Sequence, residues 1–211
     1  AREAGMFTLI DGAHAPSQVD LNLHDLGADF YTGNCHKWLC APKGAAFLHV
    51  RPEHHHLMEP LSVSWGSPPE RGINTGNDFQ DALLWSGTDD PSAYLSVPAA
   101  IAFQREHDWS SVRAQASATL DIWLPRLAAA VGLEPIYGGT SADLRPAQLA
   151  VTPMPDGTDR AALKAYLYDV HHIEIPVTGH GDRTFVRVSF QGYNTEDDLA
   201  RLEAALRDFV G

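Results

Sequence analysis

Asn34-Cys35-His36-Lys37-Trp38 is the stretch that decides the fold, and it follows a second informative stretch, Leu9-Ile10-Asp11-Gly12-Ala13-His14-Ala15. Lys37 lies 26 residues after Asp11. The sequence predicts that Asp11 closes a short apolar strand and that Lys37 lies on a turn containing Gly and Asn. Taken singly, the two residues are typical of an exposed lysine and a helix-capping aspartate. Taken together, they indicate a functional site.

A lysine and an acid in these positions are what the chemistry of pyridoxal 5′-phosphate (PLP) requires. Lys37 would form the Schiff base, and Asp11 would pair with the pyridinium nitrogen so that the ring can act as an electron sink. Trp38 and Leu39 would supply an apolar wall beside the lysine. His14 could reach the phenolic oxygen or lie beside the ring, and the alternative interpretation is a structural histidine.

Three further places carry candidate binding residues. Asn34 and His36 flank the lysine and offer donors where a phosphate could lie. Thr88 follows Gly87 just before a predicted helix, an arrangement that suits an ordinary helix cap or an anion site. Arg187 alternates with apolar neighbours on a predicted strand, where it would point outward unless it faces a cleft and binds a carboxylate.

Composition limits the classes of function. The chain has 211 residues, of which 44% are apolar and 20% charged, as in globular proteins. Its net charge of −12 argues against a nucleic-acid partner, and no apolar run is long enough to span a membrane. The cysteines, Cys35 and Cys40, form neither a CxxC pair nor a disulfide framework, so we expect a reducing cytoplasm. His54-His55-His56 has no partner with ligand-like spacing, so we expect a solvated segment and no metal site.

The pattern of elements predicts an α/β protein of two domains, residues 1–107 and 108–211. The first would contain strands at 6–10, 29–32 and 45–50, an irregular segment at 59–90, and a helix that begins at Pro91. The second would begin with a helix through Val131 that ends at Gly132. It would continue as a small α+β layer with strands at 133–137, 148–152, 173–177 and 184–190 and helices at 158–170 and 195–209, the last capped by Thr195 and Asp198.

In order along the chain, these motifs resemble the class V aminotransferase family of PLP enzymes, which has fold type I. The matching stretches are Asp11-Gly12-Ala13-His14-Ala15-Pro16, Asn34-Cys35-His36-Lys37-Trp38, Ala41-Pro42-Lys43-Gly44, Gly87-Thr88-Asp89-Asp90-Pro91, Arg187-Val188-Ser189 and Tyr193-Asn194-Thr195. The amino-acid sequences of these motifs are most similar to those of the isopenicillin N epimerase-like branch. The resemblance implies that 1–107 is the C-terminal part of the PLP-binding large domain, with a mostly parallel sheet and helices, and that 108–211 is the small C-terminal domain.

The resemblance also implies roles for the site residues. Lys37 would carry the internal aldimine, Asp11 would pair with the pyridine nitrogen, and His14 would contact the ring hydroxyl side. Asn34 and His36 would contact the phosphate. Thr88 would reach the phosphate of a partner subunit, which makes the enzyme a homodimer. Arg187 would bind the carboxylate of an amino-acid substrate.

The reaction is left open among epimerisation, C–S cleavage and transamination. Cysteine desulfurases of this family carry a nucleophilic cysteine on a small-domain loop, whereas the matching segment here, Thr178-Gly179-His180-Gly181-Asp182-Arg183, has none. Desulfuration through a protein persulfide is therefore not expected. A second hypothesis is a non-catalytic or truncated paralogue that keeps the fold and the dimer surface.

The beginning of the chain reads as the last turn of a helix that ends at Gly5, with no initiator methionine. We therefore expect a C-terminal portion of a longer protein. Alone, this portion would expose strand edges and apolar surface, so we expect it to bind PLP weakly and to aggregate.

Overall fold

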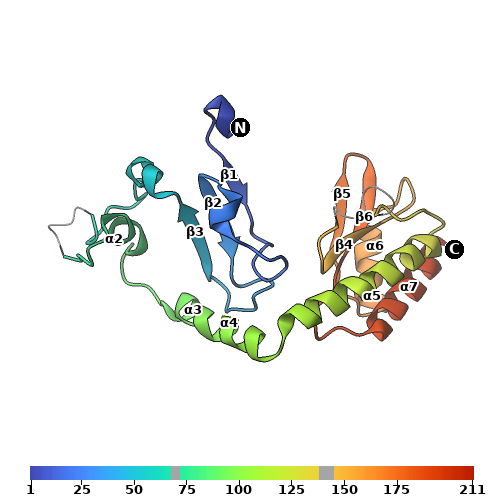
Figure 1. Cartoon of the computed structure of the whole chain (residues 1–211). Coiled ribbons are helices and arrows are strands. Elements are labelled where there is room, and N and C mark those ends of the chain that lie inside the picture. The colour runs from blue at the N-terminus through green and yellow to red at the C-terminus, as the bar shows by residue number, and fades with distance from the viewer. Residues whose placement is uncertain (68–71, 138–144) are drawn as a thin grey trace. The chain divides into compact units, whose positions relative to one another are not determined.

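The computed structural model describes residues 1–67, 72–137 and 145–211. The chain divides into two compact units, Ala1–His107 and Asp108–Gly211 (Figure 1). Each unit has its own three-stranded sheet.

The sheet of the first unit contains β1 (Leu9–Asp11), β2 (Phe30–Asn34) and β3 (Ala46–Val50) in that order. β1 and β2 run parallel, whereas β3 returns antiparallel to β2. The described sheet is therefore mixed, not mostly parallel as expected, because β2 and β3 are joined directly by the turn that carries Lys37. A direct connection of this length reverses the chain, and a parallel neighbour would need a crossover.

Short helices precede, connect and follow these strands along the chain. The bounds are Arg2–Ala4 and Pro52–Leu57 for two 3₁₀ helices, and Leu23–Leu26 for α1, Asp78–Leu84 for α2, Ser92–Leu95 for α3 and Val97–Glu106 for α4. α2 lies inside the segment that the sequence predicts as irregular. It is capped by Asn77, whose side chain accepts the Gln80 N–H at 3.1 Å, and buried Asp81 accepts the backbone N–H of Thr75 at 2.8 Å. Local capping thus builds a helix too short for the apolar pattern to reveal.

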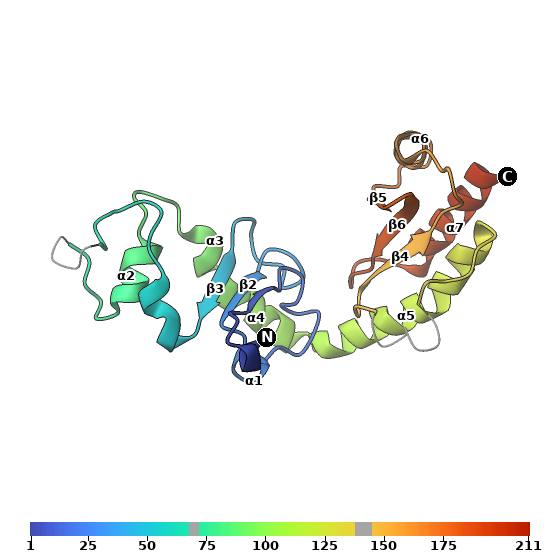
Figure 2. The ribbon, with the colours of Figure 1, turned by 90° about the horizontal axis from the view of Figure 1, so that it is seen from above.

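The second unit is an antiparallel sheet covered by helices. The strands are β4 (Leu149–Pro153), β5 (Val177–His180) and β6 (Arg183–Ser189) in the order β4-β6-β5. The helices are α5 (Trp109–Ala130), α6 (Arg160–Ala165) with a π-helical continuation at Tyr166–Val170, and α7 (Glu196–Val210). α5 lies alongside α7, as Figures 1 and 2 show.

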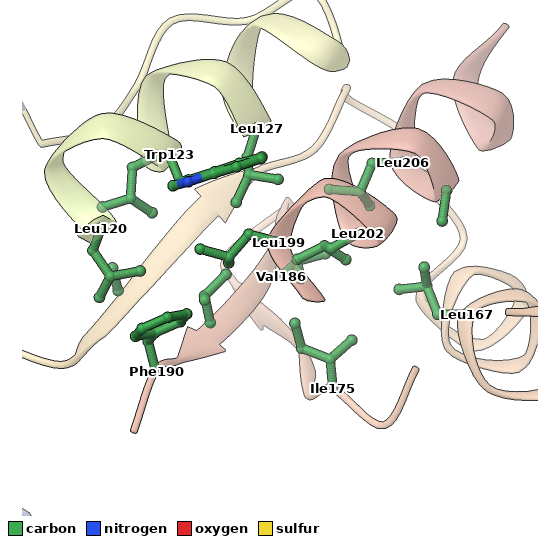
Figure 3. Packing of buried hydrophobic residues seen from close by; sticks show 14 of the residues in the cluster. Leu120, Trp123, Leu127, Leu167, Ile175, Val186, Phe190, Leu199, Leu202 and Leu206 are labelled. Atoms are coloured by element: carbon green, nitrogen blue, oxygen red, sulfur yellow. The ribbon is translucent and has the colours of Figure 1, made fainter. Parts of the chain in front are cut away.

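One large apolar core holds the second unit together (Figure 3). Alternate residues of β6, namely Thr184, Val186 and Val188, are buried, while their neighbours on the strand are more exposed. α5 contributes Leu120 and Leu127 to this core, and α7 contributes its buried leucines. The core of the first unit is much smaller and is made of Cys35, Ala41 and Ala45, with partly buried residues of the Lys37 turn, β3, α3 and α4 packed against it.

Two predicted strands are wrong in position. Residues 133–137 are not a strand, because the chain there closes α5: Gly132 adopts a left-handed φ of 74°, and the Leu133 N–H donates to the Ala128 carbonyl at 3.0 Å. The strand predicted at 173–177 begins only at Val177. The predicted Thr195–Asp198 cap of the last helix is confirmed.

Candidate active site

The carboxyl ends of β1 and β2 lie at one edge of the first sheet because the two strands are parallel. Asp11, the last residue of β1, is in register with Thr32, and the Gly12 N–H donates to the Thr32 carbonyl at 2.9 Å. β2 ends at Asn34, three residues before Lys37. The two stretches that carry the sequence motifs therefore leave the sheet side by side, at the kind of edge where α/β proteins bind ligands.

The turn that carries Lys37 is organised around one backbone oxygen. The Ala45 carbonyl accepts the backbone N–H groups of Cys35 at 2.9 Å and His36 at 3.2 Å. It also pairs with His36 Nδ1 at 2.9 Å, and because a carbonyl only accepts, Nδ1 is the donor. The Lys37 carbonyl accepts the Cys40 N–H at 3.0 Å. These bonds fix the backbone on both sides of the half-buried lysine.

Asp11 is exposed and held by a turn of its own. One carboxylate oxygen accepts the Ala13 N–H at 3.0 Å. Gly12 is necessary here because a Cβ at that position would lie 1.9 Å from the hydroxyl oxygen of Tyr31, which is 2% exposed. Burial raises the pKa of Tyr31, and the Asp11 carboxylate raises it further. The loop that carries Asp11 therefore packs at Gly12 directly against the buried Tyr31 ring.

His14 and the lysine turn are joined by a side-chain hydrogen bond. Trp38 Nε1 donates to His14 Nδ1 at 3.2 Å. Trp38 is buried, whereas His14 is exposed. The structure therefore brings His14 to the segment of Lys37 through Trp38, which the sequence predicts only as an apolar neighbour of the lysine.

α4 supports the same turn from the other side. Its Gln104 donates from Nε2 to the Trp38 carbonyl at 3.0 Å and accepts the Ser17 hydroxyl at 2.6 Å. These contacts join residues 87 and 66 positions apart in the chain, and no local pattern reveals them. Sequence reasoning missed Gln104 and Ser17 as members of the site's framework.

Thr88 lies exposed on the loop between α2 and α3. The helix that follows is only four residues long, and Asp90 accepts the Ser92 N–H at 2.9 Å near its start. Hydrogen bonds from the Ser92 hydroxyl and N–H lower the pKa of Asp90. Asp90 therefore fills the local capping role, and nothing in this geometry ties Thr88 to a phosphate within the same chain.

Arg187 lies on β6 in the second unit, opposite Val151. It lines a cavity of about 150 Å³ together with Ser189, Asn194 and Asp198. Its Nε is buried and has no hydrogen-bond partner among the described residues. Arg187 is thus half-buried and lines a cavity, and it is not a wholly outward surface residue.

The histidine run has structural contacts. His54 pairs with the buried Asp29 carboxylate at 2.9 Å, and His55 stacks on Phe79 with ring centroids 3.9 Å apart. Asp29 also accepts the Thr8 N–H and hydroxyl, each at 2.8 Å. The Thr8 N–H, then His54 and the Thr8 hydroxyl, lower the pKa of Asp29 from 3.8 to about 2. Within 1–67, 72–137 and 145–211, no three His, Cys, Asp or Glu side chains gather as metal ligands would.

Both cysteines lie on the lysine turn, and they form no disulfide with each other. Burial raises the pKa of the Cys35 thiol and of the Cys40 thiol. Raised pKa values keep both groups protonated near neutral pH, and the thiolate is the nucleophilic form. Neither cysteine has the environment of an activated nucleophile.

The family model for aminotransferase class-V matches residues 1–202. The chain belongs to this family. It is 37% identical to an isopenicillin N epimerase from Amycolatopsis lactamdurans and 34% identical to one from Streptomyces clavuligerus, over 99% and 100% of this chain and 54% of each relative. A probable chloroplastic L-cysteine desulfhydrase from Arabidopsis thaliana is 30% identical over 99% of this chain and 46% of its own. The chain spans about half the length of these curated relatives.

Solved structures confirm the fold. A cysteine desulfurase from Thermococcus onnurineus NA1 superposes with a TM-score of 0.78 at 20% identity, covering 100% of this chain and 54% of that one. A mutant of C-DES with glycine covalently linked to its PLP cofactor superposes with a TM-score of 0.71 at 19% identity, covering 93% and 50%. The chain has the α/β architecture of PLP fold type I enzymes, as the sequence predicts, and no helix among its described residues is long and apolar enough to cross a membrane.

Proposed function

We propose that this chain is the lysine-bearing part of a PLP-dependent enzyme that acts at the α-carbon of an amino acid. The observation that carries the proposal is the shared edge of β1 and β2. This edge presents the Asp11 carboxylate and the lysine turn together, and the Trp38–His14 hydrogen bond joins the two loops. The similarity to isopenicillin N epimerases and to a probable L-cysteine desulfhydrase supports this class of chemistry.

The residues present at this edge fit PLP. Asp11 offers a carboxylate whose described hydrogen bond is to the Ala13 N–H through a single oxygen, which leaves room for a pairing with a ring N–H. Lys37 offers a primary amine on a turn fixed by backbone hydrogen bonds, and His14 is bonded to Trp38, the next residue of that turn. When bound, PLP supplies an electron sink for negative charge at the substrate α-carbon.

The side chains at this edge would each have a separate role in binding the cofactor or moving a proton. Lys37 Nζ would attach the cofactor covalently and, once released by substrate, would move the proton at the α-carbon. Asp11 would hold a proton on the ring nitrogen. His14 would contact the ring hydroxyl side, and Asn34 and His36 the phosphate. Since His36 Nδ1 is engaged by the Ala45 carbonyl, Nε2 is the atom of His36 that can meet a phosphate.

Arg187 is proposed as the group that binds the substrate carboxylate. Its buried, unpartnered Nε and the adjoining cavity support this role, since a bidentate arginine–carboxylate pair satisfies such a group. Arg187→Lys should raise KM by about tenfold or more with a smaller change in kcat, because lysine keeps the charge and loses the planar fork. A change in kcat alone, measured by steady-state kinetics, would contradict this assignment.

We propose a homodimer in which Thr88 reaches the phosphate of the partner subunit. Large apolar side chains are exposed across the segment around α2 and α3, which supports an interface. These residues are Leu57, Leu61, Val63, Trp65, Leu84, Trp85, Tyr94 and Leu95. Light scattering should give twice the subunit mass for the full-length protein, and Leu61→Asp should shift it toward monomer. We also propose a reducing compartment such as the cytoplasm, which is the usual setting for a protein whose cysteines are not in a disulfide.

Borohydride reduction tests the central proposal. The full-length protein is incubated with PLP, reduced, digested, and mapped by mass spectrometry. The label should lie on Lys37 and should vanish in Lys37→Ala, while Lys43→Ala, a matched lysine on the same turn, should keep it. A folded protein whose Lys37 stays unlabelled would mean that the motif survives only as architecture, which is the prediction of the non-catalytic paralogue hypothesis.

A further inference from the structure

We propose that Trp38 is a positioning residue that fixes the tautomer of His14, so that His14 presents an N–H donor from Nε2. The role rests on the proposed function of the Asp11 edge. What is new is the assignment of a donor direction to His14 and of the residues that impose it.

The direction of the Trp38–His14 hydrogen bond follows from which of the two nitrogens can donate a proton. The indole Nε1–H can only donate, and it lies 3.2 Å from His14 Nδ1. Nδ1 must therefore be the unprotonated nitrogen of a neutral imidazole, and the ring proton resides on Nε2. A ring protonated on both nitrogens could not accept this bond. His14 thus offers a hydrogen-bond donor to an oxygen, and not an acceptor, at the edge where Asp11 ends β1.

Trp38 is itself held in place by burial of its side chain and by a hydrogen bond to its backbone carbonyl. Trp38 is 7% exposed, and its carbonyl accepts Gln104 Nε2 at 3.0 Å. The other end of the Gln104 amide accepts the Ser17 hydroxyl at 2.6 Å. Ser17 lies three residues after His14 on the same loop, with a left-handed φ of 70°. The contacts run from the loop to the lysine turn, on to α4, and back to the loop.

This closed set of contacts explains why a side-chain amide suits position 104. A glutamine can donate to a carbonyl with Nε2 and accept a hydroxyl with Oε1 at the same time, whereas glutamate lacks the donor and methionine lacks both groups. The two hydrogen bonds of Gln104 therefore fix its amide orientation and hold the main chain at Trp38, from which the indole reaches His14. We assign Gln104 and Ser17 as supports of the same positioning device.

The test reads the tautomer directly. The full-length protein without PLP is labelled with ¹⁵N-histidine, and the His14 signals, assigned with His14→Gln, are recorded in a long-range ¹⁵N–¹H experiment at neutral pH. We expect one proton, on Nε2. Trp38→Phe, which keeps an aromatic ring and removes the donor, should give a mixture that includes the Nδ1–H form. The PLP dissociation constant should rise roughly two- to tenfold, the factor that a net hydrogen bond supplies.

Trp123→Phe is the matched control. Trp123 is also a buried tryptophan that donates from Nε1, to Glu196 at 2.8 Å, but it lies in the second unit. It should leave the His14 signals and the PLP dissociation constant unchanged. Gln104→Met keeps the indole and removes its support, so it should give a partial effect of the same kind, and it replaces Trp38→Phe if that variant does not fold.

Two results would overturn the proposal: a proton on Nδ1 of His14 in the parent protein, or an unchanged His14 pattern in a folded Trp38→Phe or Gln104→Met protein. Because the tautomer is read without PLP, the result is independent of borohydride labelling. An unlabelled Lys37 together with an Nε2–H His14 would refute the proposed function and leave the positioning role intact.

Discussion

At the scale of single residues, the candidate site combines parts that the sequence reveals with parts that it hides. Asp11, His14 and Lys37 could be predicted because each occupies a motif, and the parallel pairing of β1 with β2 brings the motifs to one edge. Trp38, Gln104 and Ser17 could not, because their hydrogen bonds depend on how α4 packs against the lysine turn. The residue type shows which hydrogen bonds a side chain can donate or accept, but only the tertiary structure shows which residue is the partner.

Gly12→Ala should destabilise the protein at the site itself. The added Cβ would lie within 2.0 Å of two atoms of the Tyr31 side chain, and that buried ring cannot move aside freely. We expect a loss of about 1–3 kcal/mol in the free energy of unfolding, measured by urea denaturation. In a Tyr31→Val background the same glycine substitution should cost less, since the clash is gone. An equal cost in both backgrounds would show that the ring is not the cause.

Asp29→Asn should weaken the first unit in a pH-dependent way. The pKa of Asp29 is lowered from 3.8 to about 2, so its charged form is stabilised by folding. This contribution is complete above pH 3.8 and disappears as the pH falls through about 2. The thermal midpoint of Asp29→Asn should therefore lie below that of the parent at pH 7, and the gap should close toward pH 2.

The exposed Asp182, in the turn before β6, provides the comparison for that experiment. At pH 7 the thermal midpoint of Asp182→Asn should lie close to that of the parent, because the exposed Asp182 side chain contributes little packing. A gap between Asp29→Asn and the parent that stayed constant down to pH 2 would mean that the carboxylate charge contributes nothing.

At the scale of elements, long helices were predicted well because their signals are local. α7 begins where Thr195 and Asp198 place a cap, and α5 ends where Gly132 permits a left-handed turn. Strand positions were predicted less well. A short apolar run such as 133–137 reads as a strand, yet it becomes one only if a neighbouring strand pairs with it, and pairing is not encoded in the run itself.

Asp198→Ala should shorten or destabilise α7. The Asp198 carboxylate accepts the Thr195 N–H at 3.0 Å, and this bond is the main reason that the pKa of Asp198 is lowered. We expect a loss of about 1 kcal/mol in the free energy of unfolding of the second unit. Asp197→Ala removes the same charge from the same turn without that hydrogen bond, so it should cost clearly less in urea denaturation. Equal losses would assign the effect to charge alone.

At the scale of the whole molecule, the two units are stabilised unequally. The second unit contains nearly all of the large buried side chains, whereas the first is built around small residues and hydrogen-bonded turns. The binary pattern of the sequence predicts where apolar residues lie, but it does not reveal how many of them find partners within the same unit.

Residues 108–211 alone should fold. Their core joins α5, the sheet and α7, so the isolated segment should give a cooperative thermal transition by circular dichroism and dispersed amide signals by NMR. Residues 1–107 alone should give neither, since their buried cluster is too small to offset the chain entropy. A cooperative transition in the first segment, or its absence in the second, would contradict this division of stability.

The oxygen that organises the lysine turn belongs to the main chain. The Ala45 carbonyl receives three N–H groups, and every amino acid at position 45 would bring the same carbonyl. Side-chain substitutions at position 45 would therefore report the volume limit at the fully buried Ala45 and would leave the acceptor itself in place. Backbone chemistry reaches this acceptor most directly: ester replacement of an amide that donates to it removes one N–H from the Lys37 turn and leaves every side chain unchanged.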